Sequence, residues 1–240
     1  LQFPSYSPAG VEIAVANQVS PTGAKAAGKH GVGLLSIGAT SHGGFNALAA
    51  NWAIAEETAL EHGNRMDRAN WRLVGPVHVA ETREKARENV RYGLVRWLDY
   101  MSKVASLPLG VPAGVDPVDY MIETGFAVIG TPDDYVAQID RLSAQSGGFG
   151  CFLHLDTHWA DWAETKRSYE LVARFAIPKI NKLNAARQAS EDWLRSNNDT
   201  FRGELTAAVG AKIAEHLREK GQDKLSPDFI KLFNADKVAS

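Results

Sequence analysis

The stretch that decides the fold is Val11–Gly38, VEIAVANQVSPTGAKAAGKHGVGLLSIG. Apolar residues alternate over its first five positions and predict a strand, and the run GVGLLSIG predicts a second one. Between them, an Ala-rich segment predicts a short helix, with Ser20 as its N-cap and Pro21 at the first helical position. This order of elements predicts a βαβ unit, whose two strands run parallel.

The turn between the first strand and the helix is a candidate anion site. The first N–H groups of a helix have no partner within the helix, and the positive end of its dipole attracts anions, most often phosphate. The candidate residues of this turn are Asn17, Gln18, Val19, Ser20 and Thr22. The alternative interpretation is an ordinary βα turn that binds nothing.

The same alternation of strands and helices continues to about residue 180. Strands are predicted at 11–17, 33–38, 71–79 and 149–155, and helices at 46–62, 82–103, 131–146 and 158–177. Residues 105–125 carry several Pro and Gly and predict an irregular segment, either a linker or a mobile flap. Such alternation indicates a parallel sheet with right-handed crossovers, and both an open doubly wound sheet and a barrel segment fit it.

Composition excludes several classes of protein. A net charge of −2 over 240 residues gives no general attraction for nucleic acid. No apolar run approaches the roughly 20 residues of a membrane span. The single cysteine, Cys151, allows no intrachain disulfide, which favours a reducing cytoplasm, and its apolar neighbours predict a buried, inert thiol. No metal-ligand motif is recognisable, and no metal is expected.

Four strings resemble the bacterial luciferase-like flavin-dependent monooxygenases, and within them the limonene monooxygenase-like branch. They are AVANQVSPTGAKAAGKHGVGLLSIG, GPVHVAETREKARENVRYGL, GTPDDYVAQIDRL and THWADWAETKRSYELVARFAIP. The resemblance implies an α/β fold, the second half of a (β/α)8 barrel, strands five to eight, over residues 1–180. Residues 181–240 are expected to form a helical extension. The chain begins at Leu1, and the resemblance implies that strands one to four are lacking.

The resemblance also implies a cofactor site. The family binds reduced FMN, or F420 in some branches, and the loop after strand five takes the flavin phosphate, mainly through backbone N–H groups. This chain has Gln18-Val19 where relatives often have small residues, which leaves Ser20 and Thr22 to supply a hydroxyl. Gly38 and Ala39, after the next strand, are expected at the flavin ring, because glycine allows close backbone approach.

Other residues are candidates for the substrate pocket or for acid–base roles. Thr40, Asp156, His158 and Trp159 are expected to line the pocket, since they follow predicted strands. Three histidines are candidates for catalysis, and each of them has a structural alternative: His42, His78 and His154.

The function that follows from the resemblance is oxygenation of a small apolar substrate, such as the monoterpene limonene, by reduced FMN and O2. A separate NAD(P)H-dependent flavin reductase would supply the reduced flavin, and the protein is expected to form homo-oligomers. The alternatives are an F420-dependent oxidoreductase on the same barrel, and an inactive half-barrel or assembly subunit.

Overall fold

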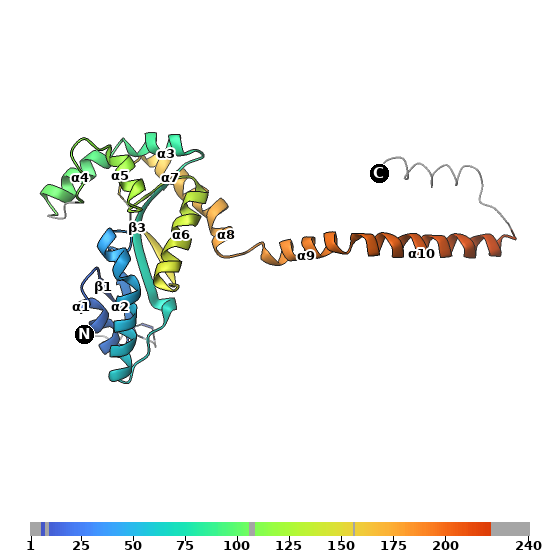
Figure 1. Ribbon diagram of the computed structural model, residues 1–240, viewed down its shortest axis with the longest axis horizontal. Helices are drawn as coiled ribbons and strands as arrows, with labels where there is room; N and C mark the ends of the chain where they lie inside the picture. Colours follow the sequence, from blue (N-terminus) through green and yellow to red (C-terminus); the bar gives the residue numbers. More distant parts are fainter. Residues whose placement is uncertain (1–5, 8–9, 106–108, 156, 222–240) are drawn as a thin grey trace. The chain divides into compact units, whose positions relative to one another are not determined.

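The computed structural model describes residues 6–7, 10–105, 109–155 and 157–221. The chain divides into two compact units, Leu1–Lys182 and Leu183–Ser240. Figure 1 shows the elements of each unit along the chain. The predicted assignment of residues 1–180 to a barrel segment and 181–240 to an extension stays a prediction.

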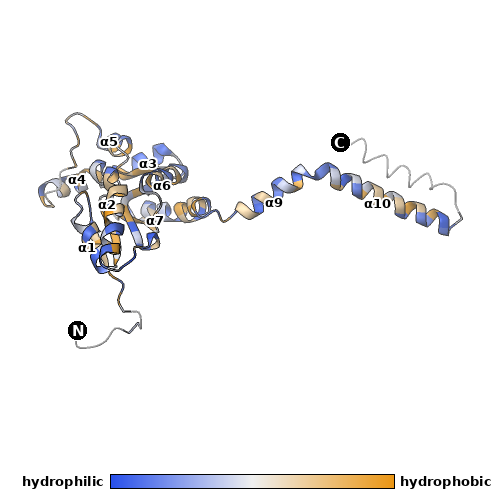
Figure 2. Ribbon diagram, turned by 60° about the horizontal axis from the view of Figure 1, so that its bottom comes forward, coloured by the Kyte–Doolittle hydropathy of each residue, from blue (hydrophilic) through white to orange (hydrophobic). Residues whose placement is uncertain are grey.

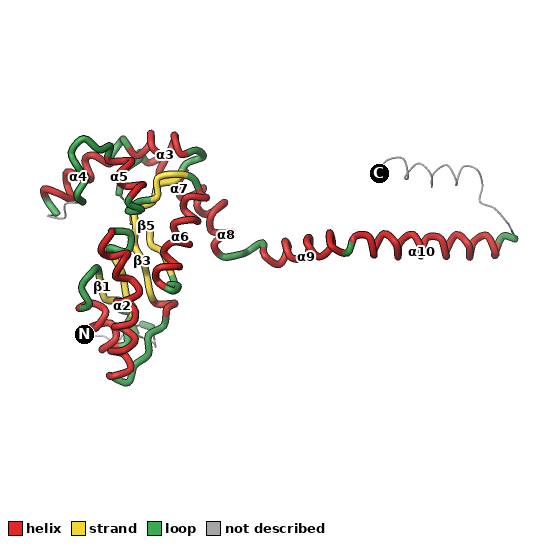
Figure 3. Tube along the Cα trace, in the orientation of Figure 1, coloured by secondary structure: helices red, strands yellow, loops and turns green. Residues whose placement is uncertain are grey.

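The first unit is built on a parallel sheet. Within its described residues the strands are β1 (Ala14–Asn17), β2 (Gly33–Ser36), β3 (Trp71–Val79), β4 (Val128–Gly130) and β5 (Cys151–Leu155). Their order is β1-β2-β3-β4, with β5 also paired to β3, and each of these pairs is parallel. Figure 3 shows the strands in yellow, with the helices in red around them. The predicted parallel α/β sheet is confirmed.

The long strand β3 changes partners along its length. It pairs with β2 at Trp71–Leu73, with β5 from Arg72 to Pro76, and with β4 from Val77 to Val79. Pro76 has no N–H to give to a ladder, and the ladder with β5 ends at this residue. The predicted strand 71–79 is confirmed.

The other predicted strands are present with shorter bounds, and β4 was not predicted. The prediction of four parallel strands therefore undercounts the described sheet by one. β4 has only three residues, Val-Ile-Gly, which are too few to show a periodic pattern.

The helices of the first unit follow the strands. They are α1 (Thr22–His30), α2 (His42–Glu61), α3 (Arg83–Val90), α4 (Leu94–Lys103), α5 (Pro117–Glu123), α6 (Pro132–Ser146), α7 (Trp162–Leu171) and α8 (Ile177–Ile180). A 3₁₀ turn, Arg68–Asn70, precedes β3, and a π-helical turn, Val172–Ala176, joins α7 to α8.

The start of α6 confirms the predicted helix at 131–146. The Thr131 hydroxyl accepts from the N–H of Asp134, and the Asp134 carboxylate accepts from the N–H of Thr131, which makes a capping box. Arg83 donates two hydrogen bonds to the same carboxylate, at 2.7 and 3.0 Å. This contact with Arg83 is the main reason that the pKa of Asp134 is lowered to about 2.

The predicted single helix at 82–103 is wrong, because the chain breaks between α3 and α4. Thr82 caps α3 as expected, by accepting from the N–H of Lys85. The break falls at Gly93, whose N–H donates to the carbonyl oxygen of Trp159 at 2.9 Å. A Cβ on Gly93 would lie 2.1 Å from the carbonyl oxygen of His158, so only glycine fits there. A tertiary contact therefore overrides the helical pattern.

Two other predicted segments differ from the structure. The irregular segment at 105–125 contains α5, which was not predicted and which Asp116 caps. Leu109 and Val111 pack against buried residues, whereas residues 112–115 are exposed, and the choice between a linker and a flap stays a prediction. Residues 106–108 lie outside the described residues. The predicted helix 158–177 begins instead at Trp162, and Pro178 lies in the first turn of α8, where its ring is tolerated.

The two faces of the sheet differ. The helix side buries Trp71 and Leu73 with Leu48 and Trp52 of α2. The opposite face, called here the inner face, carries residues with half-buried or exposed side chains: Ala14, Ala16, Leu35, Val74, Cys151, Leu153 and Leu155. The prediction of a buried Cys151 is wrong, since its side of the strand is exposed.

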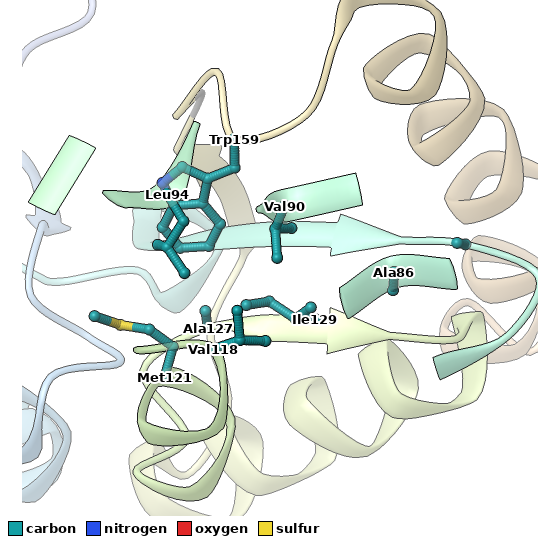
Figure 4. Close-up of a cluster of buried hydrophobic side chains, with 9 residues drawn as sticks. Ala86, Val90, Leu94, Val118, Met121, Ala127, Ile129 and Trp159 are labelled. Atoms are coloured by element: carbon teal, nitrogen blue, oxygen red, sulfur yellow. The ribbon is translucent and has the colours of Figure 1, made fainter. Parts of the chain in front are cut away.

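A separate hydrophobic cluster lies beyond the carboxyl end of β3 and includes Ala80 and Ile129 of β4. It joins Ile129 of β4 to residues of α3, α4 and α5, and to Trp159 after β5. Figure 4 shows these side chains gathered together. Trp159 also meets Trp97 of α4 edge-on, with ring centroids 5.2 Å apart. The segment from α3 to α5 is thereby tied to the loop that follows β5.

The second unit contains α9 (Ala185–Ser196) and α10 (Asn198–Glu219). Both helices carry hydrophobic as well as hydrophilic residues (Figure 2), and none of their residues is buried. The rings of Trp193 and Phe201 lie 5.4 Å apart. Among the described residues of the chain, no helix is long and apolar enough to cross a membrane.

The contact at Gly93 makes a prediction about stability. Gly93→Ala should lower the free energy of unfolding by about 1–3 kcal/mol, because the added methyl group overlaps the His158 carbonyl. Urea unfolding measures this change. Gly203→Ala in α10, where no atom lies within 4 Å of the added Cβ, is the control and should be neutral or slightly stabilising. Equal effects of the two substitutions would contradict the prediction.

Candidate functional site

The loops after parallel strands meet at one edge of the sheet, where α/β proteins bind their ligands. In this chain the edge is formed by the loop after β1, the loop between β2 and α2, the end of β3 and the segment after β5. Most of the predicted site residues lie in these segments.

The loop after β1 is held in place by a side chain from α2. Asn51 is buried, and its amide donates to the carbonyl oxygens of Gln18 and Val19, at 3.1 and 3.4 Å. In a trans peptide the N–H points opposite to the carbonyl. The N–H groups of Val19 and Ser20 therefore point away from α2. Asn51 was not among the predicted site residues.

The helix start beside this loop differs in detail from the prediction. α1 begins at Thr22 with Pro21 before it, so Ser20 is not the N-cap, and no side chain in the described part of the chain caps this helix start. The Ser20 hydroxyl instead contacts the hydroxyl of Thr22 at 3.4 Å. The dihedral angles of Pro21 are close to helical, and its carbonyl oxygen accepts from the N–H of Lys25 at 2.9 Å. The N–H groups of the first turn stay available to a ligand.

An open hollow of about 430 Å³ lies beside the loop after β1. Its lining includes most of the predicted phosphate residues, namely Asn17, Gln18, Ser20 and Thr22, together with Val15, Ala16, Gly23, Ala26 and Ile37. The side chain of Val19 is exposed and is not part of this lining. A Cβ on Gly23 would lie 2.5 Å from the carbonyl oxygen of Ala16, so a glycine is needed to bring α1 close to β1. Asn17 is buried at the end of β1.

The loop between β2 and α2 lies against the loop after β1. A Cβ on Gly38 would lie 3.4 Å from Gln18, and one on Gly43 would lie 3.1 Å from Val19. Ser41 caps α2: its hydroxyl donates to the Gly38 carbonyl and accepts from the N–H of Gly44. The structure thus brings together the two segments predicted to bind the cofactor. Sequence reasoning missed the role of Ser41.

Three further candidates in this loop have different surroundings. Ala39 and Thr40 are buried, and a Cβ on Gly75 of β3 would lie 2.5 Å from the Thr40 methyl group. Thr40 therefore packs against the middle of β3. His42 is exposed in the first turn of α2, 3.4 Å from the amide of Asn46.

The segment after β5 holds the remaining pocket candidates. Trp159 is buried in the cluster with α4, and His158 has a left-handed backbone conformation, with φ at 51°. Thr157 is also buried. Asp156 lies outside the described residues. Within the described part of the chain, no group of three or more His, Cys, Asp or Glu side chains is placed to hold a metal.

His78 is buried near the carboxyl end of β3. Asn89 of α3 lies 3.1 Å from its Nε2, and the same amide donates to Glu164 of α7 at 2.9 Å. Burial lowers the pKa of His78, although Glu164 and Asp161 oppose the shift. A small cavity of about 20 Å³ lies beside the ring. Burial and the contact with Asn89 are those of a satisfied core histidine, whereas a role for His78 at the flavin rim stays a prediction.

His154 lies on the helix side of β5. Its Nε2 is 2.9 Å from the Tyr135 hydroxyl of α6, and its ring stacks on Tyr169 of α7, with centroids 5.8 Å apart. Burial lowers its pKa to about 4, and burial also raises the pKa of Tyr135 to about 12. These surroundings separate His154 from the inner face and favour packing over catalysis.

The comparisons with known proteins point to one family. No family model matches the chain. Over 210 residues, 88% of this chain, it is 41% identical to limonene 1,2-monooxygenase of Rhodococcus erythropolis. Over 202 residues it is 34% identical to 4-hydroxyprotoasukamycin monooxygenase of Streptomyces nodosus subsp. asukaensis. Each alignment covers 53% of the relative, so the chain spans about half the length of these curated relatives.

Solved structures agree on the fold. The oxygenating constituent of 3,6-diketocamphane monooxygenase of Pseudomonas putida, solved in complex with FMN, matches with a TM-score of 0.54 and 23% identity, over 70% of this chain and 48% of that one. Monooxygenase RslO1 of Streptomyces bottropensis matches with a TM-score of 0.56 and 20% identity, over 72% and 50%. The predicted fold, a parallel α/β sheet matching about half of a luciferase-like barrel, is confirmed.

Parallel strands with helices between them, and an α/β barrel as the matching architecture, define the class of fold. The chain belongs to the luciferase-like flavin monooxygenase superfamily, and its sequence is limonene monooxygenase-like.

The burial of His154 predicts a pH dependence of stability. Its folded pKa of about 4 lies below the ordinary value, so the unfolded chain binds a proton first as the pH falls. The contribution of neutral His154 to the free energy of unfolding is present above about pH 6.5. Between pH 7 and pH 5 this contribution should fall by about 2 kcal/mol. His154→Phe should remove that loss in urea unfolding at the two pH values.

Tyr135→Phe is the control for this experiment. It removes the hydroxyl partner and leaves the buried imidazole, so most of the pH dependence should remain. An unchanged loss of stability in His154→Phe would show that His154 is not responsible.

Proposed function

We propose that this chain contributes the flavin phosphate site of a flavin-dependent monooxygenase that uses reduced FMN and O2. The substrate is a small apolar molecule, with a cyclic monoterpene such as limonene as the first choice. The observation that carries the proposal is the 41% identity to limonene 1,2-monooxygenase over 210 residues, 88% of this chain. The FMN complex of the 3,6-diketocamphane enzyme supports the choice of cofactor.

The loop after β1 fits a phosphate. Asn51 turns the N–H groups of Val19 and Ser20 away from α2, and the first turn of α1 adds further free N–H groups. The hollow beside the loop has room for the group, and Gly23 keeps the helix start close to the strand. Ser20 and Thr22 add hydroxyls, while Gly38 and Ala39 would border the ring system.

The flavin would activate O2. The residues of this chain would bind the flavin, orient it and exclude water. Thr40, Trp159, His158 and Asp156 are proposed for the substrate side of the rim. A separate NAD(P)H-dependent reductase is the proposed source of reduced flavin, homo-oligomers are the proposed assembly, and the cytoplasm is the proposed location.

Two alternatives have distinct outcomes. An F420-dependent oxidoreductase would bind the deazaflavin in place of FMN, and titration with both cofactors separates the two. An inactive assembly subunit would bind neither cofactor, even when the rest of a barrel is supplied.

The exposed inner face leads to a prediction about how this chain behaves by itself. Leu153 and Leu155 are 38% and 40% exposed there, although a parallel sheet is ordinarily covered on both faces. We expect the 240-residue chain alone to self-associate and to show no oxygenation. Adding about 150 residues of matching barrel, as a fused or co-expressed segment, should give a soluble protein that binds FMN. Analytical ultracentrifugation and flavin titration measure both outcomes. A monodisperse monomer of this chain that oxygenates a terpene would refute the prediction.

The phosphate site has its own test in the completed barrel. Ser20→Pro removes one N–H from the loop and should weaken FMN binding by about 1.5–3 kcal/mol, the value of one charge-assisted hydrogen bond. Ser20→Ala keeps the N–H and removes the hydroxyl, so it separates the backbone contribution from that of the side chain. Fluorescence titration of FMN gives the affinities. Unchanged affinity in a folded Ser20→Pro variant would place the phosphate elsewhere.

A further inference from the structure

A polar network of hydrogen-bonded side chains connects the end of β3 to α7 through α3. His78 and Asn89 are 4% and 8% exposed, and Glu164 lies at the more exposed end of this polar network. The Asn89 amide nitrogen lies 3.1 Å from His78 Nε2 and 2.9 Å from Glu164 Oε2. Lys85 lies 3.6 Å from the other carboxylate oxygen of Glu164. None of these contacts belongs to the proposed phosphate site.

The donors and acceptors of this polar network can be assigned from the number of hydrogens that each group carries. A carboxylate oxygen only accepts, so the Asn89 group that faces Glu164 must be the NH2 group. That group carries two hydrogens, and the second one is directed at His78. Nε2 of His78 must then accept, which leaves the proton of a neutral imidazole on Nδ1.

The surroundings of His78 agree with a neutral ring. The charged and titratable groups near it are Glu164 and Asp161 at the start of α7, Lys85 on α3, and His158 and Tyr169 across the small cavity. Burial outweighs the two carboxylates and lowers the pKa of His78. An imidazolium would have two donors and could not accept from Asn89.

The neutral ring of His78 lies where it could contact a ligand. Its register partner is Ile129 of β4, and its ring borders the cavity of about 20 Å³ together with Thr157 and Ser168. A cavity of this size has room for about one water molecule or for one polar atom of a ligand. The cavity lies where the end of β3 meets the segment after β5.

We propose that Asn89 is a positioning residue that fixes His78 as the neutral Nδ1–H tautomer, so that His78 serves at the rim as a hydrogen-bond donor and not as a base. The tautomer follows from the contacts alone. Its use in oxygenation rests on the proposed function, where a donor at the end of β3 would orient an oxygen atom of the substrate or of the cofactor.

Solid-state ¹⁵N NMR of histidine-labelled protein tests the tautomer, and it works for soluble and self-associated samples alike. The chain has seven histidines, and the signal lost in His78→Gln identifies His78. In the unsubstituted chain at pH 7 we expect a protonated Nδ1 and an unprotonated Nε2. A protonated Nε2 in the unsubstituted chain would overturn the proposal without any further variant.

Asn89→Asp is the sharpest variant, because it keeps the shape and turns the donor into an acceptor. His78 should then carry a proton on Nε2, either as the other tautomer or as an imidazolium. Asn46→Asp is the matched control, since Asn46 stands beside Nε2 of the exposed His42 in the same way, and it should leave the His78 signal unchanged. An unchanged Nδ1–H signal in a folded Asn89→Asp variant would also overturn the proposal.

Activity of the completed barrel separates this inference from the proposed function. If both hold, Asn89→Asp should lower kcat at least fivefold, with less than a twofold change in the affinity for FMN. If the tautomer is confirmed and no flavin binds, the proposed function fails and the assignment of His78 stands. If flavin binds and kcat is unchanged, the role of His78 as a donor in oxygenation is refuted.

Discussion

One strand holds the first unit together, because the nine residues of β3 pair with β2, β5 and β4. Trp71 fixes its first end: the indole N–H donates to Ser36 of β2, and the ring stacks on Trp52 of α2 at 4.6 Å. Pro76, without an N–H, marks the residue at which the ladder with β5 ends. The rim loops on both sides of β3 take their positions from this strand.

Local signals predicted the fold where they are strong. The strand at 71–79 and the Thr131-Pro132-Asp133-Asp134 start of α6 have clear local signals, and both were predicted correctly. The break at Gly93 could not be predicted from a helical pattern, because it depends on the backbone at His158, 65 residues further along the chain. β4 was missed because a three-residue strand is defined by its partner and not by its own pattern.

The site shows the same division. The loop after β1 was predicted from Ser20-Pro21, yet the side chain that holds it, Asn51, comes from the next helix and has no local signature. The period of two along a strand puts Cys151 and His154 on opposite faces of β5, but it does not tell which face the helices cover. The pairing of His78 with Asn89 likewise joins a strand to the helix after it, and only the folded chain shows it.

The polar rim and the apolar inner face depend on each other. On the helix side, β3 buries its side chains against α2, whereas the inner face leaves Leu153 and Leu155 substantially exposed. The ion pair of Arg72, next to Cys151 in the ladder, with Glu12 is also partly open to solvent. The backbone N–H groups of the loop after β1 gain strength as an anion site only where water is excluded, because hydrogen bonds to a charge weaken in a high dielectric. Covering the inner face would therefore do two things at once, burying the apolar side chains and strengthening the polar groups at the rim.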